Sequence, residues 1–176
     1  MGRSRALVIA VAAIMIALTA VFTLLVRVPI PATQGYFNFS DVAIFFAAFT
    51  FGPWIGLVAG GVGTALADIM GGYAQFAPLS LVAHGLEGLL VGLLARQARG
   101  WRLALAWLAG AAAMVGLYFA GEFWVFGIGP EAFAEVPINL FQVAVGGLVG
   151  IPLYYAVRRA YPPITRMAEP TSWREE

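Results

Sequence analysis

Long apolar runs with almost no charged side chain limit what this sequence can fold into more than any other feature. Runs of this kind cover residues 6–26, 103–115 and 143–155. Inside lipid, backbone amides must pair within their own segment, so such runs predict membrane-spanning helices. The runs also lack the alternation of polar and apolar residues that is typical of a membrane β-barrel. We therefore expect an all-α integral membrane protein.

Composition agrees with this class, since 61% of the 176 residues are hydrophobic, 11% are charged and the mean hydropathy is +0.87. At roughly 20 residues per span, the chain has room for a bundle of six transmembrane helices with short loops. We expect a single domain over residues 1–161 and a disordered cytoplasmic tail over residues 162–176. The predicted helices cover about residues 4–27, 41–51, 54–70, 78–96, 102–126 and 136–159. Ser40 or Asp41 is the predicted N-cap of the second helix.

The positions of the arginines predict how the bundle sits in the membrane. Nine of the ten arginines precede the first helix, lie between the fourth and fifth, or follow the sixth, and Arg27 is the exception. By the positive-inside rule that side is cytoplasmic, which places both termini inside and the loops at 28–40, 71–77 and 127–135 outside. Because the arginines do not share one face, no nucleic-acid partner is expected. Cysteine is absent, which excludes disulfides and thiolate chemistry.

Polar and ionisable residues gather at one depth once this topology is imposed. They lie near the outer ends of the predicted helices, and intramembrane charges usually face a cavity because they are costly in lipid. A polar cup of this kind predicts capture of a small molecule from outside and argues against a channel. Aromatic rings at the same level either form an interfacial belt or help to line the pocket. The predicted substrate-binding residues are Tyr36, Phe37, Asn38, Asp41, Asp68, Tyr73, His84, Glu87, Glu122, Trp124, Asn139 and Gln142.

Small residues recur at one-turn spacing in several of the predicted helices. The glycine pairs Gly56-xxx-Gly60, Gly88-xxx-Gly92 and Gly146-xxx-Gly150 predict close packing between helices. Ala13-xxx-Ala17 in the first helix predicts either internal packing or a smooth face for another membrane protein.

A run of short motifs covers about residues 13–95. The motifs are Pro29-Ile30-Pro31, Gly35-Tyr36-Phe37-Asn38-Phe39-Ser40-Asp41, Phe51-Gly52-Pro53, Gly60-Gly61-Val62-Gly63-Thr64-Ala65-Leu66-Ala67-Asp68, Gly72-Tyr73, Ala77-Pro78 and Gly85-Leu86-Glu87-Gly88. With these motifs the chain resembles the substrate-binding S components of energy-coupling factor (ECF) vitamin transporters, in the riboflavin or hydroxymethylpyrimidine group. The second half is similar mainly in its spacing. One departure is His84, which stands where the family pattern has a lysine, so the charge preference of the ligand stays open.

The resemblance implies a multi-pass protein of a prokaryotic plasma membrane that binds a vitamin at the outer face. It implies docking on a transmembrane coupling subunit with two cytoplasmic ATPases, with Ala13 and Ala17 facing the coupling subunit and residues 29–40 forming the gate. The chain itself has no ATP-binding Gly-x-x-x-x-Gly-Lys loop. We expect no enzymatic activity, no cofactor and no metal.

The ligand and one alternative function remain open at this point. Several carboxylates without any lysine favour a neutral or cationic ligand with hydrogen-bond donors, such as an aminopyrimidine, thiamine or a pyridoxine-like ring. Riboflavin stays possible. The alternative is an intramembrane metal-dependent hydrolase that uses His84 and Glu87, which share one helix face but need a third ligand.

Overall fold

The structure is a computed structural model that describes residues 5–95 and 100–164. The predicted disordered tail lies outside the described residues from residue 165 onward. The elements are, in chain order, α1 (Arg5–Leu25), β1 (Val28–Ile30), β2 (Gly35–Phe37), α2 (Ser40–Phe51), α3 (Pro53–Gly71), α4 (Ala77–Leu94), α5 (Trp101–Ala120), the π-helical turn η1 (Gly121–Val125), the 3-10 helix η2 (Gly129–Ala134) and α6 (Val136–Ala160).

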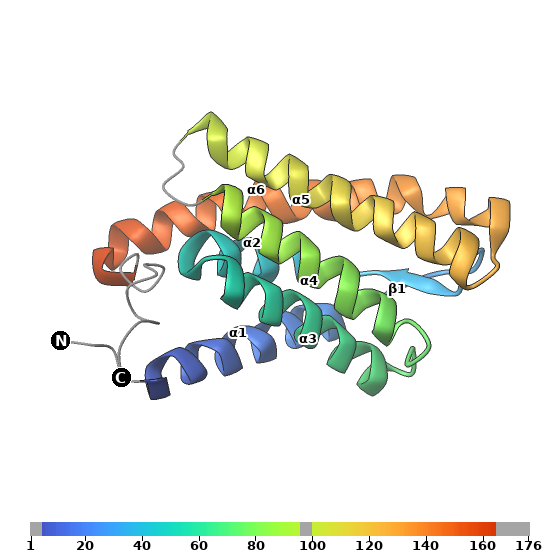
Figure 1. The fold of residues 1–176 in the computed structure, drawn as a ribbon, viewed down its shortest axis with the longest axis horizontal. Coiled ribbons are helices and arrows are strands. Elements are labelled where there is room, and N and C mark those ends of the chain that lie inside the picture. The colour runs from blue at the N-terminus through green and yellow to red at the C-terminus, as the bar shows by residue number, and fades with distance from the viewer. Residues whose placement is uncertain (1–4, 96–99, 165–176) are drawn as a thin grey trace.

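The helices pack along one long axis and form the predicted all-α bundle (Figure 1). In the described part of the chain, five helices are long and apolar enough to cross a membrane. The sixth, α2, has 12 residues. At 1.5 Å per residue it is about 18 Å long, which is shorter than the hydrocarbon core. α2 is therefore a partial span, and it begins inside the bundle rather than at its outer face.

A short β-hairpin occupies the space that α2 leaves open. Pro29 and Pro31 cannot continue a helix, and β1 pairs with β2 in antiparallel register, with Val28 opposite Phe37 and Ile30 opposite Gly35. β2 is fully buried. Residues 28–40, predicted as an outer loop, thus contain a hairpin that folds into the bundle, and this is the one departure from an all-helical chain among the described residues.

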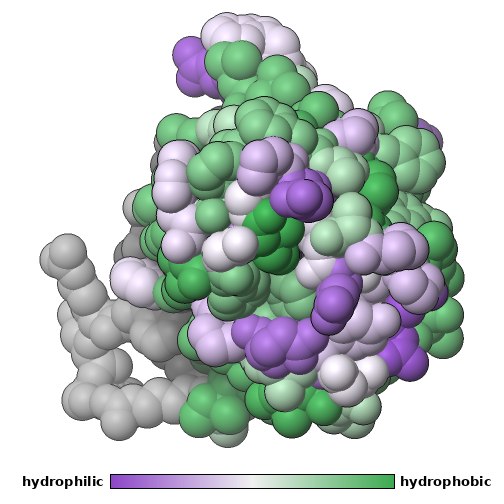
Figure 2. Space-filling model, turned by 90° about the vertical axis from the view of Figure 1, so that its right-hand side faces the viewer, coloured by the Kyte–Doolittle hydropathy of each residue, from purple (hydrophilic) through white to green (hydrophobic). Residues whose placement is uncertain are grey.

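The two ends of the bundle differ in charge. The starts of α1 and α5 and the end of α6 lie at one end of the bundle (Figure 1). The described arginines Arg102, Arg158 and Arg159 lie at this end. By the positive-inside rule this end faces the cytoplasm. Figure 2 looks onto the opposite, outer end, where hydrophilic side chains gather in the lower half among hydrophobic ones. The exposed polar residues of this outer end include Arg27, Gln34, Gln75 and Glu131.

Glycines allow the helices to approach closely, as their spacing predicts. A Cβ added at Gly88 would lie 2.2 Å from the carbonyl oxygen of Gly56, and one at Gly60 would lie 2.2 Å from that of His84. Backbones of α3 and α4 are therefore in direct contact. At α6, a Cβ on Gly146 would lie 2.5 Å from the Cβ of Asp41. The packing interpretation of the glycine pairs is confirmed, and these contacts position the helices that carry the polar residues.

Candidate functional site

A polar cavity lies between the hairpin and the outer halves of α1, α3, α4, α5 and α6. The space that it leaves for water-sized molecules is about 20 Å³, which holds a water molecule but no vitamin ring. Among the lining residues none is a lysine or an arginine. Six predicted substrate-binding residues line it, together with seven others. The lining residues are Thr23, Gly35, Tyr36, Asn38, Thr64, Asp68, Phe76, Ser80, His84, Tyr118, Glu135, Asn139 and Gln142.

The hairpin contributes a tyrosine to one wall of the cavity. The hydroxyl of Tyr36 donates a hydrogen bond of 2.5 Å to Oδ1 of Asp68, at the outer end of α3. Burial, together with the neighbouring Asp68 carboxylate, raises the pKa of the Tyr36 hydroxyl, which therefore stays a donor. Tyr73 packs against the ring of Tyr36 with a centroid distance of 4.4 Å, but it is not among the lining residues.

Asn38 links the hairpin to two helices. Its backbone N–H donates to Oε1 of Gln142 on α6 at 3.0 Å, and its side-chain Oδ1 accepts from the N–H of Ser40 at 2.8 Å. Asn38 thus satisfies a free amide at the start of α2. The prediction that Ser40 or Asp41 caps this helix is wrong: Phe39 occupies the cap position without a side-chain hydrogen bond. The side chain of Asp41 is released for another contact inside the bundle.

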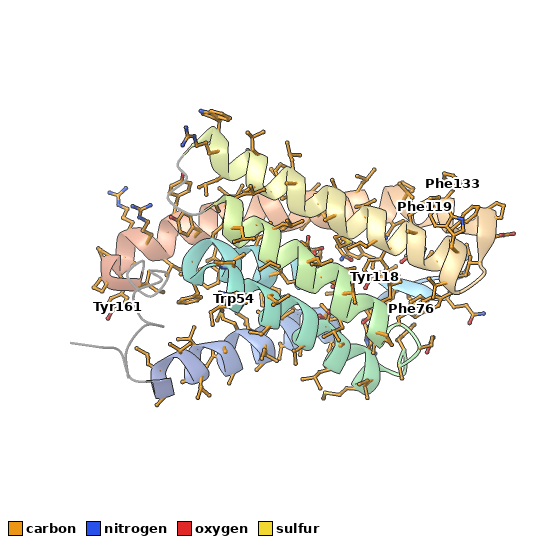
Figure 3. All side chains as sticks on the ribbon, in the orientation of Figure 1. Trp54, Phe76, Tyr118, Phe119, Phe133 and Tyr161 are labelled. Carbon is orange, nitrogen blue, oxygen red and sulfur yellow. The ribbon has the colours of Figure 1, made fainter. Side chains whose placement is uncertain are left out.

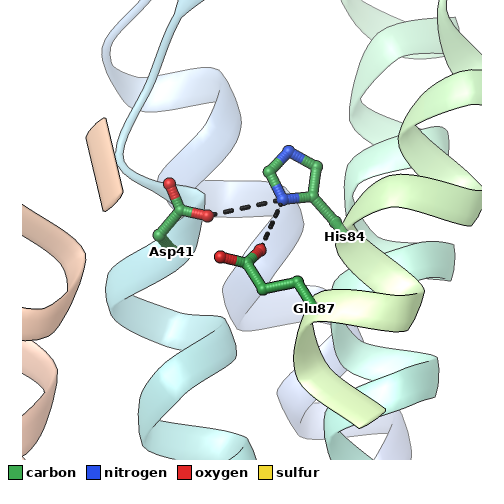
Figure 4. A group of neighbouring side chains, drawn as sticks. All are labelled: Asp41, His84 and Glu87. Atoms are coloured by element: carbon green, nitrogen blue, oxygen red, sulfur yellow. Dashed lines mark hydrogen bonds and ion pairs between the residues drawn. The ribbon is translucent and has the colours of Figure 1, made fainter. Parts of the chain in front are cut away.

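That contact is a buried cluster of Asp41, His84 and Glu87 (Figure 4). Nδ1 of His84 lies 2.9 Å from Oε2 of Glu87, one turn along α4, and 3.4 Å from Oδ1 of Asp41 on α2. All three side chains are at most 2% exposed. His84 is among the residues that line the cavity, whereas Asp41 and Glu87 are not. Three ligand-type atoms within 4.8 Å of one another give the hydrolase alternative its missing third group, Asp41.

A second carboxylate pair lies near the outer mouth. The π-helical turn η1 carries Glu122, which is buried, and Glu122 interacts with the carboxyl group of Glu135. Neither side-chain oxygen of Glu122 has a hydrogen-bond partner among the described residues. Glu135, predicted in an outer loop, is instead 3% exposed and lies against Gly35 of the hairpin, where a Cβ would come within 2.9 Å of its Oε1. Either group can accept a hydrogen bond from a ligand. If one of the two carboxyl groups is protonated, it can donate to the other.

Three predicted aromatic binding residues, Tyr73 among them, are not brought to the cavity. Trp124 is 69% exposed and packs against Phe119 and Phe123 at the outer end of α5. Figure 3 shows Phe119 beside Phe133 in this same group. Phe37 is buried but contacts Phe39 and Phe141 rather than the cavity. The belt interpretation therefore accounts for Trp124 better than the pocket interpretation.

Several cavity residues were absent from the predicted site, although the sequence holds a signal for them. Three of them lie four residues before a predicted site residue: Thr64 before Asp68, Ser80 before His84, and Tyr118 before Glu122. Residues four apart share one helix face. Including the residue one helical turn before each predicted site residue would thus have identified these three hydroxyl groups.

Comparisons with known proteins show which proteins the chain is similar to. A family model described as an ECF-type riboflavin transporter S component matches residues 5–159. The chain is 40% identical over 145 residues to an uncharacterized protein of Pyrococcus woesei, covering 82% of this chain and 97% of that protein. It is 35% identical over 135 residues to the thiamine precursor transporter HmpT of Lactococcus lactis subsp. cremoris (strain MG1363), covering 76% and 77%.

A solved structure has the same fold. It is described as the S component of a bacterial ECF transporter, and it superposes with a TM-score of 0.67 at 22% identity, covering 89% of this chain and 98% of that one. At this identity the likeness speaks for the fold alone.

Proposed function

Because the chain belongs to the family of S components of ECF-type transporters, we propose that its cavity captures a small aminopyrimidine of the thiamine-precursor type. S components bind small vitamins, partner with an ECF module and are not enzymes. The 35% identity to a thiamine precursor transporter supports the aminopyrimidine. Riboflavin is the second candidate, because the matching family model carries that description. A pyridoxine-like ring has the same kind of donor groups.

The observation that carries the proposal is the chemistry of the cavity wall. Asp68 and Glu135 present carboxylates, and Asn139 and Gln142 present amides, whereas no lysine or arginine lines the cavity. Ionised carboxylates only accept hydrogen bonds. The wall is therefore suited to a ligand rich in N–H and O–H donors and unsuited to a multiply anionic one.

Entry of a ring requires part of the wall to move. The cavity volume of about 20 Å³ is far below the roughly 300 Å³ at which small-molecule pockets begin. The hairpin and its flank, residues 29–40, form a wall of the cavity that is not itself a membrane-spanning helix. We assign this segment as the gate, closed over the cavity through the contacts of Tyr36 with Asp68 and of Asn38 with Gln142.

Uptake then needs partners. We assign Ala13 and Ala17, both exposed on α1, to the surface that docks on a transmembrane coupling subunit with two cytoplasmic ATPases, in the plasma membrane of a prokaryote. The hydrolase alternative has less support. Its candidate ligands Asp41 and Glu87 are not among the residues that line the cavity, so a substrate in the cavity would not contact them.

The test is to identify and titrate the ligand. We expect mass spectrometry of the purified, denatured protein to release an aminopyrimidine, and isothermal titration to give tighter binding of hydroxymethylpyrimidine than of riboflavin or pyridoxine. Tighter binding of riboflavin would overturn the aminopyrimidine and favour the second candidate. Absence of binding for every vitamin tested would overturn the assignment of the cavity.

A further inference from the structure

His84 is the one residue among those lining the cavity that can carry a positive charge. Both polar contacts that the structure shows for its ring use Nδ1, which faces Oε2 of Glu87 at 2.9 Å and Oδ1 of Asp41 at 3.4 Å. Since an ionised carboxylate can only accept, Nδ1 must carry a hydrogen for these contacts to be favourable. The carboxylates therefore fix the orientation of the ring.

The charges of the cluster determine whether the other ring nitrogen of His84, Nε2, carries a hydrogen. Asp41 and Glu87 are both buried, and neither carboxyl oxygen of Asp41 nor Oε1 of Glu87 has a hydrogen-bond partner among the described residues. With a neutral imidazole, two carboxylates would share one donor in a low-dielectric interior, which is a costly arrangement. A second ring proton places a full positive charge between them and offsets this cost. Nε2 then carries a hydrogen as well.

This second nitrogen lies on the side of the ring away from both carboxylates (Figure 4). The ring meets Tyr118 edge to face at a centroid distance of 5.4 Å, and both residues line the cavity. We propose that Nε2–H of His84 is the subsite that recognises a hydrogen-bond acceptor of the ligand, with Asp41 and Glu87 as positioning residues that hold the charged ring from behind. The proposal rests on the proposed function, because it places the ligand in this cavity.

The cavity lining therefore combines a donor with acceptors, and this defines the ligand class more closely. His84 offers the donor, and Asp68 and Glu135 offer acceptors. A matching ligand is a heterocycle with an acceptor, such as a ring nitrogen, on one edge and an amino or hydroxyl donor on another. An aminopyrimidine has both groups, whereas a purely donating cation would leave Nε2–H unpaired, which costs binding affinity.

The first arm of the test needs no ligand. His84 is the only histidine in the chain, so protein labelled with ¹⁵N-histidine gives two assignable ring nitrogen signals. In ligand-free protein in detergent we expect both nitrogens to be protonated. We expect Glu87→Gln to shift the balance toward the neutral ring, and the exposed control Glu131→Gln to leave both signals unchanged. A bare nitrogen in the wild-type ring, or replacement of the Nδ1 hydrogen by added zinc, would overturn the proposal.

The second arm is a chemical double-mutant cycle on binding. Hydroxymethylpyrimidine and its pyridine analogue, which lacks one ring nitrogen, are titrated against wild type, His84→Gln and His84→Lys. Either change alone, the pyridine analogue or His84→Gln, removes one charged hydrogen bond and should weaken binding by roughly tenfold to a hundredfold. Combining the two changes should cause no further loss, because both remove the same hydrogen bond. His84→Lys should retain most of the affinity, since it keeps a cationic donor.

The two arms separate the two proposals. Independent, multiplying losses in the cycle would overturn the role of His84 while leaving capture of the aminopyrimidine intact. If wild type binds no aminopyrimidine at all, the proposed ligand is wrong, and the ¹⁵N signals alone decide whether His84 presents a charged donor to the cavity.

Discussion

At the scale of single residues, two buried aspartates pair with groups from other elements. Asp68 on α3 accepts from Tyr36 on the hairpin, and Asp41 on α2 meets His84 on α4. Ionisable groups in the membrane are costly, so each pairing both lowers that cost and ties two elements together. These polar residues therefore hold the hairpin and the helices in register.

The contact between Tyr36 and Asp68 gives the first prediction. Tyr36→Phe keeps the ring but leaves Oδ1 of Asp68 without its donor, and a lost hydrogen bond to a charged group costs about 1.5–3 kcal/mol. We expect a lower denaturation midpoint in detergent and a faster release of ligand, because the hairpin loses one of its polar links to the helices. The matched control is Tyr73→Phe, which removes a hydroxyl that has no hydrogen bond among the described residues. Equal effects of the two variants would contradict this role of Asp68.

The sequence predicted the depth of the polar residues but not their partners. Depth follows from where charges interrupt apolar runs, so Asp41, His84 and Glu87 were found. Their grouping depends on how α2 and α4 are rotated about their axes, which no local pattern sets. Glu135 was predicted only as part of an outer loop, because its burial also depends on tertiary contacts. It is buried against Gly35 of the hairpin, which is far away in the sequence, and no local pattern predicts that contact.

At the scale of elements, the contact between α3 and α4 decides where His84 and Glu87 sit. Gly56 and Gly88 face each other so closely that each would place a Cβ within 2.5 Å of the other's carbonyl oxygen. Because both obstacles are backbone atoms, no side-chain rotation can relieve a clash there. Any larger residue must push the two helices apart and move the cluster behind the cavity.

This contact gives the second prediction. Gly88→Ala should cost about 1–3 kcal/mol of stability, the usual range for overpacking a tight core, and should weaken ligand binding through the shift of α4. The control is Gly116→Ala on α5, where an added Cβ meets nothing within 4 Å. That change should be neutral or stabilising by up to about 1 kcal/mol, because alanine favours a helix over glycine. Thermal unfolding in detergent and isothermal titration measure both effects, and an unchanged Gly88→Ala protein would refute the close contact.

Helix positions were predictable because they follow from apolar runs and their breaks. Residues 54–70 and 136–159 were expected, and α3 and α6 are Pro53–Gly71 and Val136–Ala160. The hairpin was not foreseen, since strands of three residues are too short to show a period of two. Its prolines indicated only that the helix had to end. The partial span of α2 follows from the hairpin, which fills the outer half of the bundle in its place.

At the scale of the whole molecule, α1 is the least enclosed of the long helices. In its most apolar window 17% of the residues are buried, against 50% in α3 and in α4. Ala13 and Ala17 lie on its exposed side, and the neighbouring Ile9 and Ile14 are 68% and 60% exposed. Small side chains at one-turn spacing let another helix approach closely. This exposed face is where the proposed coupling subunit has room to bind without disturbing the cavity.

The third prediction tests that face. Ala13→Trp and Ala17→Trp place a bulky ring on an exposed surface, so the protein should fold and bind its ligand with unchanged affinity, while uptake into cells and copurification with the coupling subunit are lost. Ala112→Trp is the matched control, because Ala112 is an exposed alanine on α5, and it should leave uptake intact. Uptake that persists in both α1 variants would exclude this face as the docking surface. Misfolding of either variant would show instead that these alanines pack against the protein's own core, in conflict with their exposure.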